Sequence, residues 1–197
     1  MFRQRRTAAA GLTVLLTATA SCGDALGPVD SIPMTLTINS MNSSDIDPPG
    51  VIEKDENIST ETGNPWGEFI RLAEDQCQAA PIGFEVLSVS IGLDVAGSSG
   101  VQVLEDVISG DATVFFASTQ GSDAAAVRVD VGSRSGVTGA GPVSLPVTAT
   151  RAQLGALLER LLGGDFHVGL RAETDRLDTD SFSMDVRVTL QNRAICE

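Results

Sequence analysis

The chain has 197 residues, 42% of them hydrophobic, with 26 acidic and only 13 basic residues. That length suits a single domain with its own core. The formal net charge of −13 argues against binding to nucleic acid, which requires a basic face, and against electrostatic attraction to anionic lipids. A large net charge of one sign instead favours solubility of the domain.

The N-terminus has the pattern of an export signal. Arg3, Arg5 and Arg6 give a positive start, and the stretch from Thr7 to Gly23 carries no charge. A membrane-spanning helix needs about 20 mainly apolar residues, whereas this run is short and rich in alanine and threonine. We therefore predict a cleaved signal peptide over residues 1–21. Its removal leaves 10 basic residues against 26 acidic ones, a net charge near −16.

The sequence Ala-Thr-Ala-Ser-Cys at residues 18–22 resembles the lipobox of bacterial lipoproteins, although Thr19 stands where leucine is favoured. The resemblance implies cleavage before Cys22, a thioether-linked diacylglycerol on its sulfur and an acylated amine. Two acylation sites give stable anchoring, where a single chain would bind reversibly. Gly23 follows in place of the aspartate that marks inner-membrane retention, which favours the outer membrane. The alternative is an ordinary secretory signal with a free Cys22.

Residues 22–31 are expected to form a lipidated tether, and residues 32–197 a single domain. Apolar residues alternate with polar ones from Ile32 to Ile38, which predicts a half-buried strand. Residues 40–63 are acidic and poor in apolar side chains, and we interpret them as a long loop, with one short strand near residues 57–60 as an option.

A helix is predicted from Pro65 to about Gln78. Asn64 is a suitable N-cap, and proline is favoured at the first helical position. Apolar side chains, including the single tryptophan Trp66, share one face, and Pro81 ends the segment. Strict alternation then predicts a long strand over residues 84–95.

Two segments, residues 104–111 and 158–165, share an L-E-x-x-x-x-G-D pattern and indicate an internal repeat. Each predicts a short amphipathic helix, a glycine stop and a strand begun by aspartate. A strand precedes each copy and two strands follow it. Thr150 and Gln153 form a capping box before the second helix. We expect each helix to cross between two sheets; coincidence of a short pattern is the alternative.

The clearest strand covers residues 181–193, with apolar side chains at every second position from Phe182 to Leu190. Continued alternation points Cys196 inward, and Cys77 lies on the apolar face of the predicted helix. Because an exported protein meets an oxidising compartment, we predict a Cys77–Cys196 disulfide. Two buried free thiols are the alternative.

Candidate chemistry is sparse. His167 is the only histidine, and alternation places it on the outward face of strand 166–172 with Gly169 and Arg171, which we interpret as a surface position. No nucleophile elbow, phosphate loop or dinucleotide fingerprint is present. The D-x-D pairs are weak Ca²⁺ candidates, and solvated turns explain them better: Asp45 and Asp47, Asp178 and Asp180.

The sequence as a whole predicts an all-β, two-sheet β-sandwich, immunoglobulin-like in general build, with two or three short helices. We expect a lipid-anchored cell-envelope protein with a non-catalytic structural or binding role, no catalytic residue, no cofactor and no bound nucleic acid. Its expected partners are the membrane, through Cys22, and a protein of the envelope. A carboxylate-dependent hydrolase, or a Ca²⁺- or ligand-binding module using the acidic loops, remains the alternative.

Overall fold

The computed structural model describes residues 27–61, 63–118 and 126–197. The predicted signal peptide and Cys22 therefore lie outside the described residues. Among the helices that are described, none has the length and apolar character that crossing a membrane requires.

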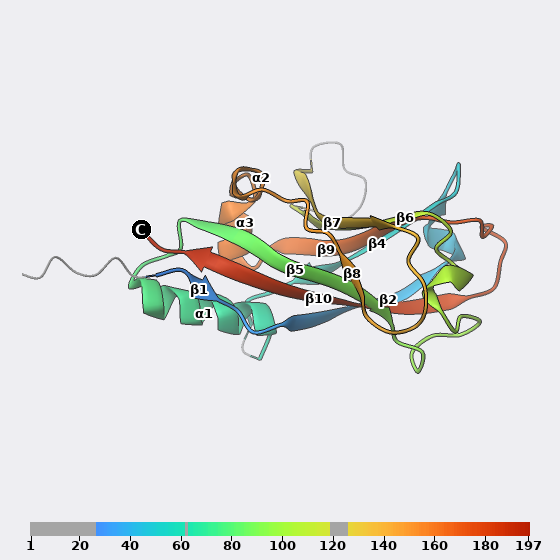
Figure 1. Cartoon of the computed structure of the whole chain (residues 1–197), viewed down its shortest axis with the longest axis horizontal. Helices are drawn as coiled ribbons and strands as arrows, with labels where there is room; N and C mark the ends of the chain where they lie inside the picture. The colour runs from blue at the N-terminus through green and yellow to red at the C-terminus, as the bar shows by residue number, and fades with distance from the viewer. Residues whose placement is uncertain (1–26, 62, 119–125) are drawn as a thin grey trace, which may run out of the picture.

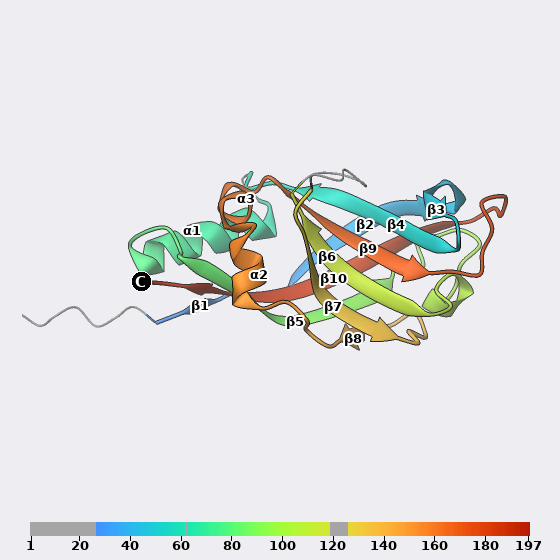
Figure 2. The same ribbon diagram turned by 90° about the horizontal axis from the view of Figure 1, so that it is seen from above.

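Within these described residues, ten strands form two antiparallel sheets that pack face to face (Figures 1 and 2). The first sheet contains β1 (Val29–Asp30), β2 (Met34–Asn42), β5 (Gly83–Leu93), β8 (Val143–Leu145) and β10 (Ser183–Ile195). The second sheet contains β3 (Ile46–Asp47), β4 (Val51–Ile58), β6 (Asp111–Ala117), β7 (Arg128–Ser135) and β9 (Phe166–Glu173). The α-helices are α1 (Pro65–Cys77), α2 (Arg151–Gly155) and α3 (Leu158–Gly163), and two short 3₁₀ turns are η1 (Ser43–Asp45) and η2 (Leu104–Asp106). The predicted class, an all-β two-sheet sandwich with short helices, is confirmed.

The connectivity within this class is that of a jelly roll. The first sheet has the strand order β2-β10-β5-β8, and the second has β4-β9-β6-β7. If these eight strands are lettered B to I in chain order, the sheets read B-I-D-G and C-H-E-F, the two interleaved Greek keys of a jelly roll. This order differs from the immunoglobulin-like arrangement that we expected. Alternation locates strands along the chain but does not say which edges pair.

The hydrophobic core lies between the sheets and follows the predicted alternation closely in β10. Its inward side chains, from Met184 to Leu190, are fully buried. β10 pairs with β5 along one side, and with β2 and then β1 along the other. Ile32 departs from the prediction: it is 80% exposed, because the chain leaves the sheet between β1 and β2. Val29 and Asp30, which we expected in the tether, instead pair with β10.

The expected acidic loop over residues 40–63 is wrong. This segment contains the end of β2, the η1 turn, β3 and the whole of β4. Lys54 and Glu56 occupy inward positions of β4, where a strand pattern requires apolar side chains. The sequence therefore did not predict this strand. Both side chains instead contact the backbone of β2 in the first sheet. Lys54 Nζ donates to the Ser40 carbonyl (2.8 Å), and Glu56 Oε1 accepts from the Asn39 amide (3.1 Å).

The two repeat copies occupy corresponding places in the fold. After β5 of the first sheet, the chain crosses through η2 to β6 of the second; after β8 of the first sheet, it crosses through α2 and α3 to β9. The expected crossings are therefore confirmed, but the first is only a 3₁₀ turn and the second is split into two helices. The capping box of Thr150 and Gln153 is present at the start of α2.

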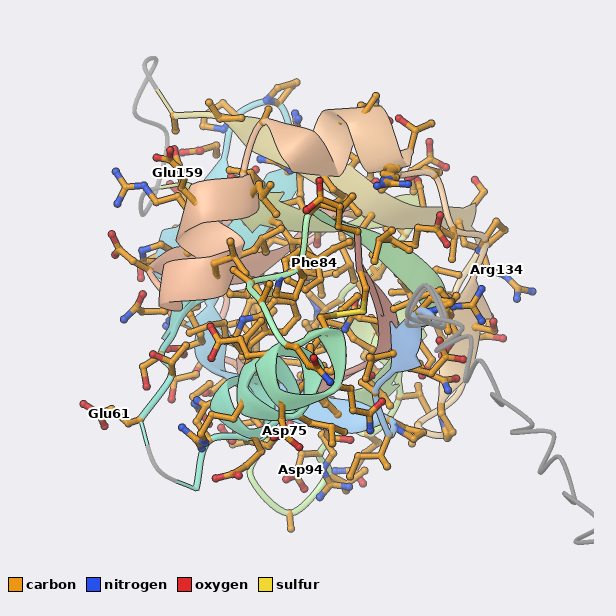
Figure 3. The ribbon with its side chains drawn as sticks, turned by 90° about the vertical axis from the view of Figure 1, so that its left-hand side faces the viewer. Glu61, Asp75, Phe84, Asp94, Arg134 and Glu159 are labelled. Atoms are coloured by element: carbon orange, nitrogen blue, oxygen red, sulfur yellow. A yellow bond between two sulfur atoms is a disulfide. The ribbon has the colours of Figure 1, made fainter. Side chains whose placement is uncertain are left out.

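The three α-helices gather at one end of the sandwich, where the chain also ends (Figures 1 and 3). Helix α1 has the predicted Asn64 cap and buries Trp66, whose ring lies 4.9 Å from that of Phe166 and 5.8 Å from that of Phe84. Trp66 Nε1 donates to the Leu161 carbonyl of α3 (2.8 Å), which satisfies its only polar group. The apolar residues of α1 and α3 thus close this end of the core.

The predicted Cys77–Cys196 disulfide is present, with Cα atoms 5.2 Å apart. It joins the last residue of α1 to the segment after β10, and Figure 3 shows the sulfur bridge beside the helix. The bond closes a loop of 119 residues. In the chain-entropy model, such a loop stabilises the folded state by at most roughly 4–5 kcal/mol.

A Cys77→Ala/Cys196→Ala variant should therefore unfold at a lower urea concentration, with the free energy of unfolding reduced by up to about 4–5 kcal/mol. Fluorescence of the single, buried Trp66 reports the transition. Reducing agent should lower the midpoint of the wild-type chain to a similar value and leave the variant unchanged. Equal midpoints for the oxidised wild-type chain and the variant would contradict this assignment.

Candidate functional site

The solvent-facing side of the second sheet is the candidate site. Four strands lie side by side there in the order β4-β9-β6-β7, and their outward side chains form a regular grid. Most members of this outer face are polar or charged. They include Glu53 and Asp55 of β4, His167, Gly169, Arg171 and Glu173 of β9, Asp111, Thr113 and Phe115 of β6, and Arg128, Asp130 and Ser133 of β7.

Neighbouring side chains on the outer face are paired across the strands. Thr113 and Ser133 share a hydrogen bond of 2.9 Å between their hydroxyl oxygens. Asp111 accepts a hydrogen bond from the Ser135 hydroxyl, and its backbone amide donates to the Glu173 carboxylate (3.3 Å). Cross-strand pairs of this kind each contribute about 0.2–1 kcal/mol to sheet stability, so part of the face has a purely structural explanation.

Arg128 reaches from the edge strand β7 over Phe115 of β6 to Glu53 of β4. Its guanidinium carbon is 3.5 Å from the centre of the Phe115 ring. Arg128 Nη1 donates to Glu53 of β4 (2.8 Å), and Nε contacts the carboxylate of Asp130 (3.4 Å). A cation over an aromatic ring gains about 0.5–2 kcal/mol, more where water is excluded. The arginine is thus fixed by a ring below and a carboxylate on each side.

Phe115 is a buried aromatic side chain that does not belong to the core. It is only 1% exposed, yet it is absent from the cluster of side chains between the sheets, because β6 turns Val114 and Phe116 inward and Phe115 outward. Its ring rests on Gly169 of β9: a Cβ atom there would lie 2.1 Å from Phe115 Cζ. The missing side chain of Gly169 therefore gives the ring its place.

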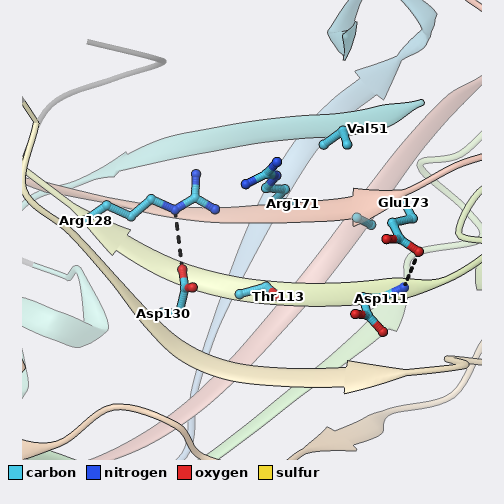
Figure 4. A pocket seen from close by; sticks show the side chains of 8 residues that line it. Val51, Asp111, Thr113, Arg128, Asp130, Arg171 and Glu173 are labelled. Atoms are coloured by element: carbon cyan, nitrogen blue, oxygen red, sulfur yellow. Dashed lines mark hydrogen bonds and ion pairs between the residues drawn. The ribbon is translucent and has the colours of Figure 1, made fainter. Parts of the chain in front are cut away.

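A hollow of about 190 Å³ opens beside Arg128 (Figure 4). Arg171 stands at its centre, 53% exposed, with a long contact of 3.7 Å to Glu53. Both guanidinium groups and the carboxylates of Asp130, Asp111 and Glu173 rise from the same side of the sheet. The lining thus contains both hydrogen-bond donors and acceptors, with the two arginines side by side and Asp111 and Glu173 together at the other end.

Two further hollows adjoin the first and share its arginines. One, of about 430 Å³, extends past Phe115 to the β3-β4 turn at Pro48 and Pro49. The other, of about 530 Å³, extends past Asp130 to Gln153 of α2. Arg128 and Arg171 line all three, so they stand where the hollows meet. The depressions together follow the sheet surface and do not form one enclosed chamber.

His167 points outward as predicted, but it is not a freely exposed surface residue. Its side chain is 14% exposed, and Nδ1 lies 3.0 Å from Oδ1 of Asp55, which is itself 5% exposed. Asp55 comes from β4, two positions along the grid from Glu53. Asp55 was not expected beside His167, because residues 40–63 were predicted to form a loop and not a strand of this sheet.

The four aspartates that we considered for Ca²⁺ do not come together. Asp45 accepts from the Asn42 amide and contacts Lys54 (3.4 Å), and Asp180 accepts from the Leu177 amide. Asp47 and Asp178 line one shallow depression beside the Pro48–Pro49 turn. Within residues 27–61, 63–118 and 126–197, no group of three or more metal-ligating side chains is found.

Arg176 organises the loop beside this depression. Its Nε donates to the Asp106 carbonyl (2.7 Å). The Asp106 carboxylate accepts from the amides of Gln102 and Val103, and these bonds, with the nearby Arg176 charge, hold the pKa of Asp106 below its usual value. The carboxylate is therefore engaged in turn structure, and we assign it no role in ligand binding.

Comparison with known proteins adds little. No protein-family model matches the chain, and no curated protein matches it. Among solved structures, it is similar to the three-dimensional structure of Cocksfoot mottle virus, with 9% sequence identity and a TM-score of 0.35 over 100% of this chain and 96% of that chain. A TM-score this low supports no conclusion, and the jelly-roll assignment depends on the strand order alone.

Replacing Gly169 with alanine should displace the Phe115 ring and lower the free energy of unfolding. The added Cβ would collide with the Phe115 ring, and overpacking of this kind typically costs about 1–3 kcal/mol. Gly141→Ala is the matched control, because a Cβ at Gly141 meets no atom within 4 Å. Urea unfolding of both variants measures the effect. Equal stability of Gly169→Ala and Gly141→Ala would show that Phe115 is not held against β9.

Proposed function

We propose that the chain is a lipid-anchored cell-envelope protein whose jelly-roll domain is a non-catalytic binding module. The ligand lies on the outer face of the second sheet, over the hollow between Arg128 and Arg171. The observation that carries this proposal is the arrangement of that hollow. Arg128 is held by Phe115, Glu53 and Asp130 before any ligand arrives, which reduces the entropy that binding costs, and Arg171 stands exposed beside it.

The anchor part of the proposal depends on the sequence at Cys22, and the fold is compatible with it. The carbonyl oxygen of Gly27 lies 3.4 Å from Cys196 Sγ, at the helix-covered end of the sandwich. Cys22 precedes Gly27 by only five residues, a reach of at most about 18 Å. The helix-covered end would then face the membrane. The outer face runs along the length of the sandwich and would stay open to other envelope components (Figure 2).

A carboxylate-dependent hydrolase is the second candidate, and one observation favours it. Asp111, Asp130 and Glu173 line the same hollow, and glycoside hydrolysis needs two suitably spaced carboxyl groups. The two candidates differ in the fate of the ligand. A binding module releases the ligand intact. A hydrolase cleaves it into fragments, and Glu173→Gln or Asp130→Asn would abolish this cleavage.

The binding role can be tested without knowing the ligand. A Cys22→Ser chain, free of lipid, should sediment with isolated envelopes of the source cells, and Arg171→Met should remove most of this association. Arg134→Met is the matched control, because Arg134 lies on the same strand as Arg128 but donates to the Ser144 carbonyl (3.1 Å) outside the hollow. Equal sedimentation of the Arg171→Met and Arg134→Met chains would contradict the proposed face.

The anchor is tested separately in the producing cells by Cys22→Ser combined with Arg171→Met, which also removes the proposed association of the outer face with the envelope. Loss of both lipid modifications should move the protein from the membrane fraction to the soluble exported fraction, because stable anchoring requires more than one acyl chain. Mass spectrometry of the wild-type chain should show the diacylglycerol and the acylated amine. A Cys22→Ser/Arg171→Met chain that stays in the membrane fraction after a high-salt wash would contradict lipid anchoring.

A further inference from the structure

The hollow between Arg128 and Arg171 has a chemistry that can be matched to a ligand class. Hydrogen-bond donors and acceptors line it together: the two guanidinium groups donate, the carboxylates of Asp111, Asp130 and Glu173 accept, and Thr113 can do both. A sugar hydroxyl both accepts and donates, so it can bridge a guanidinium and a carboxylate at once. Hydrogen bonds to ionised groups are about twice as strong as those between neutral groups.

The charge balance argues against strongly charged ligands. Two arginines line the hollow together with the carboxylates of Asp111, Asp130 and Glu173, and Glu53 contacts both arginines from outside it. An anionic ligand would meet more carboxylates than arginines. A polycation would meet the exposed guanidinium of Arg171 at the centre. An uncharged ligand with many hydroxyls avoids both penalties.

The shape argues for a chain and against a small enclosed molecule. Small-molecule pockets bury most of the surface of their ligand, whereas the central hollow, of about 190 Å³, lies open on the surface of the sheet. It continues on two sides into the hollows near Pro49 and near Gln153. A ligand of repeating units lying across the strands would fill all three in succession.

Phe115 makes this arrangement specific. A large aromatic ring on the outer side of a sheet has to be covered, and here the Arg128 guanidinium covers it at 3.5 Å. The contact with the ring restricts the movement of the guanidinium. Glu53 and Asp130 hold it from opposite sides. Donors held in this way suit hydroxyl groups at a regular spacing.

We propose that the outer face of the second sheet binds a neutral oligosaccharide chain, with Arg128, Arg171 and Asp130 making the central contacts. This inference rests on the proposed binding role of the same face and adds the ligand class to it.

The test is a binding titration with the full chain carrying Cys22→Ser, so that no detergent with a sugar headgroup is needed. The probes are short neutral gluco-, manno- and galacto-oligosaccharides, with oligogalacturonate as the anionic arm and chitosan oligomers as the cationic arm. We expect binding to at least one neutral series. Arg171→Met and Asp130→Asn should each weaken it on the order of 10- to 100-fold, since each removes hydrogen bonds to a charged group. Arg134→Met should leave it unchanged.

The outcomes separate this inference from the proposed function. Binding to oligogalacturonate or chitosan alone would overturn the neutral ligand and leave the binding face standing. Failure of every neutral series, while envelope sedimentation still depends on Arg171, would overturn the saccharide in favour of another envelope component. Loss of both dependences on Arg171 would overturn the proposed function as well. Urea unfolding followed by Trp66 fluorescence confirms that each variant is folded.

Discussion

The structure depends on the burial of β10. This strand pairs with β5 on one side and with β2 and β1 on the other, so most of the first sheet is built around it. Its inward side chains from Met184 to Leu190 are fully buried. A slip of one residue would turn them all to solvent. The register of β10 therefore sets the positions of its neighbours, and the Cys77–Cys196 bond fixes the end of its segment to α1.

The burial of one side of the second sheet leaves the other side free to carry polar groups. In β9, Val168 and Leu170 face the core while His167 and Arg171 face outward. The core holds the backbone of these strands, so the outward side chains start from fixed points. Hydrogen bonds and ion pairs across the strands then orient them. Because these side chains are already ordered, they lose less conformational entropy when a ligand binds to them.

The sequence predicted the features that depend on local pattern. The cap of α1, the alternation in β10 and the cysteine pairing all follow from nearby residues or from their inward direction. The sequence did not predict the features that depend on contacts between distant segments. β4 was not recognised as a strand, because Lys54 and Glu56 occupy its inward positions and contact β2. The contact between Asp55 of β4 and His167 was therefore not predicted either. The jelly-roll order escaped because alternation does not encode which strands are neighbours.

Phe115 could have drawn attention from the sequence alone, because alternation with Val114 and Phe116 turns it away from the core. Two local preferences are broken at this point of the sheet: a large aromatic faces outward, and Gly169 interrupts the interior of a strand. Glycine within a strand weakens it and often marks a close approach of another group. Because real proteins tend to break such preferences where function requires it, the layered contact of Gly169, Phe115 and Arg128 is the strongest physical reason to place the ligand on this face.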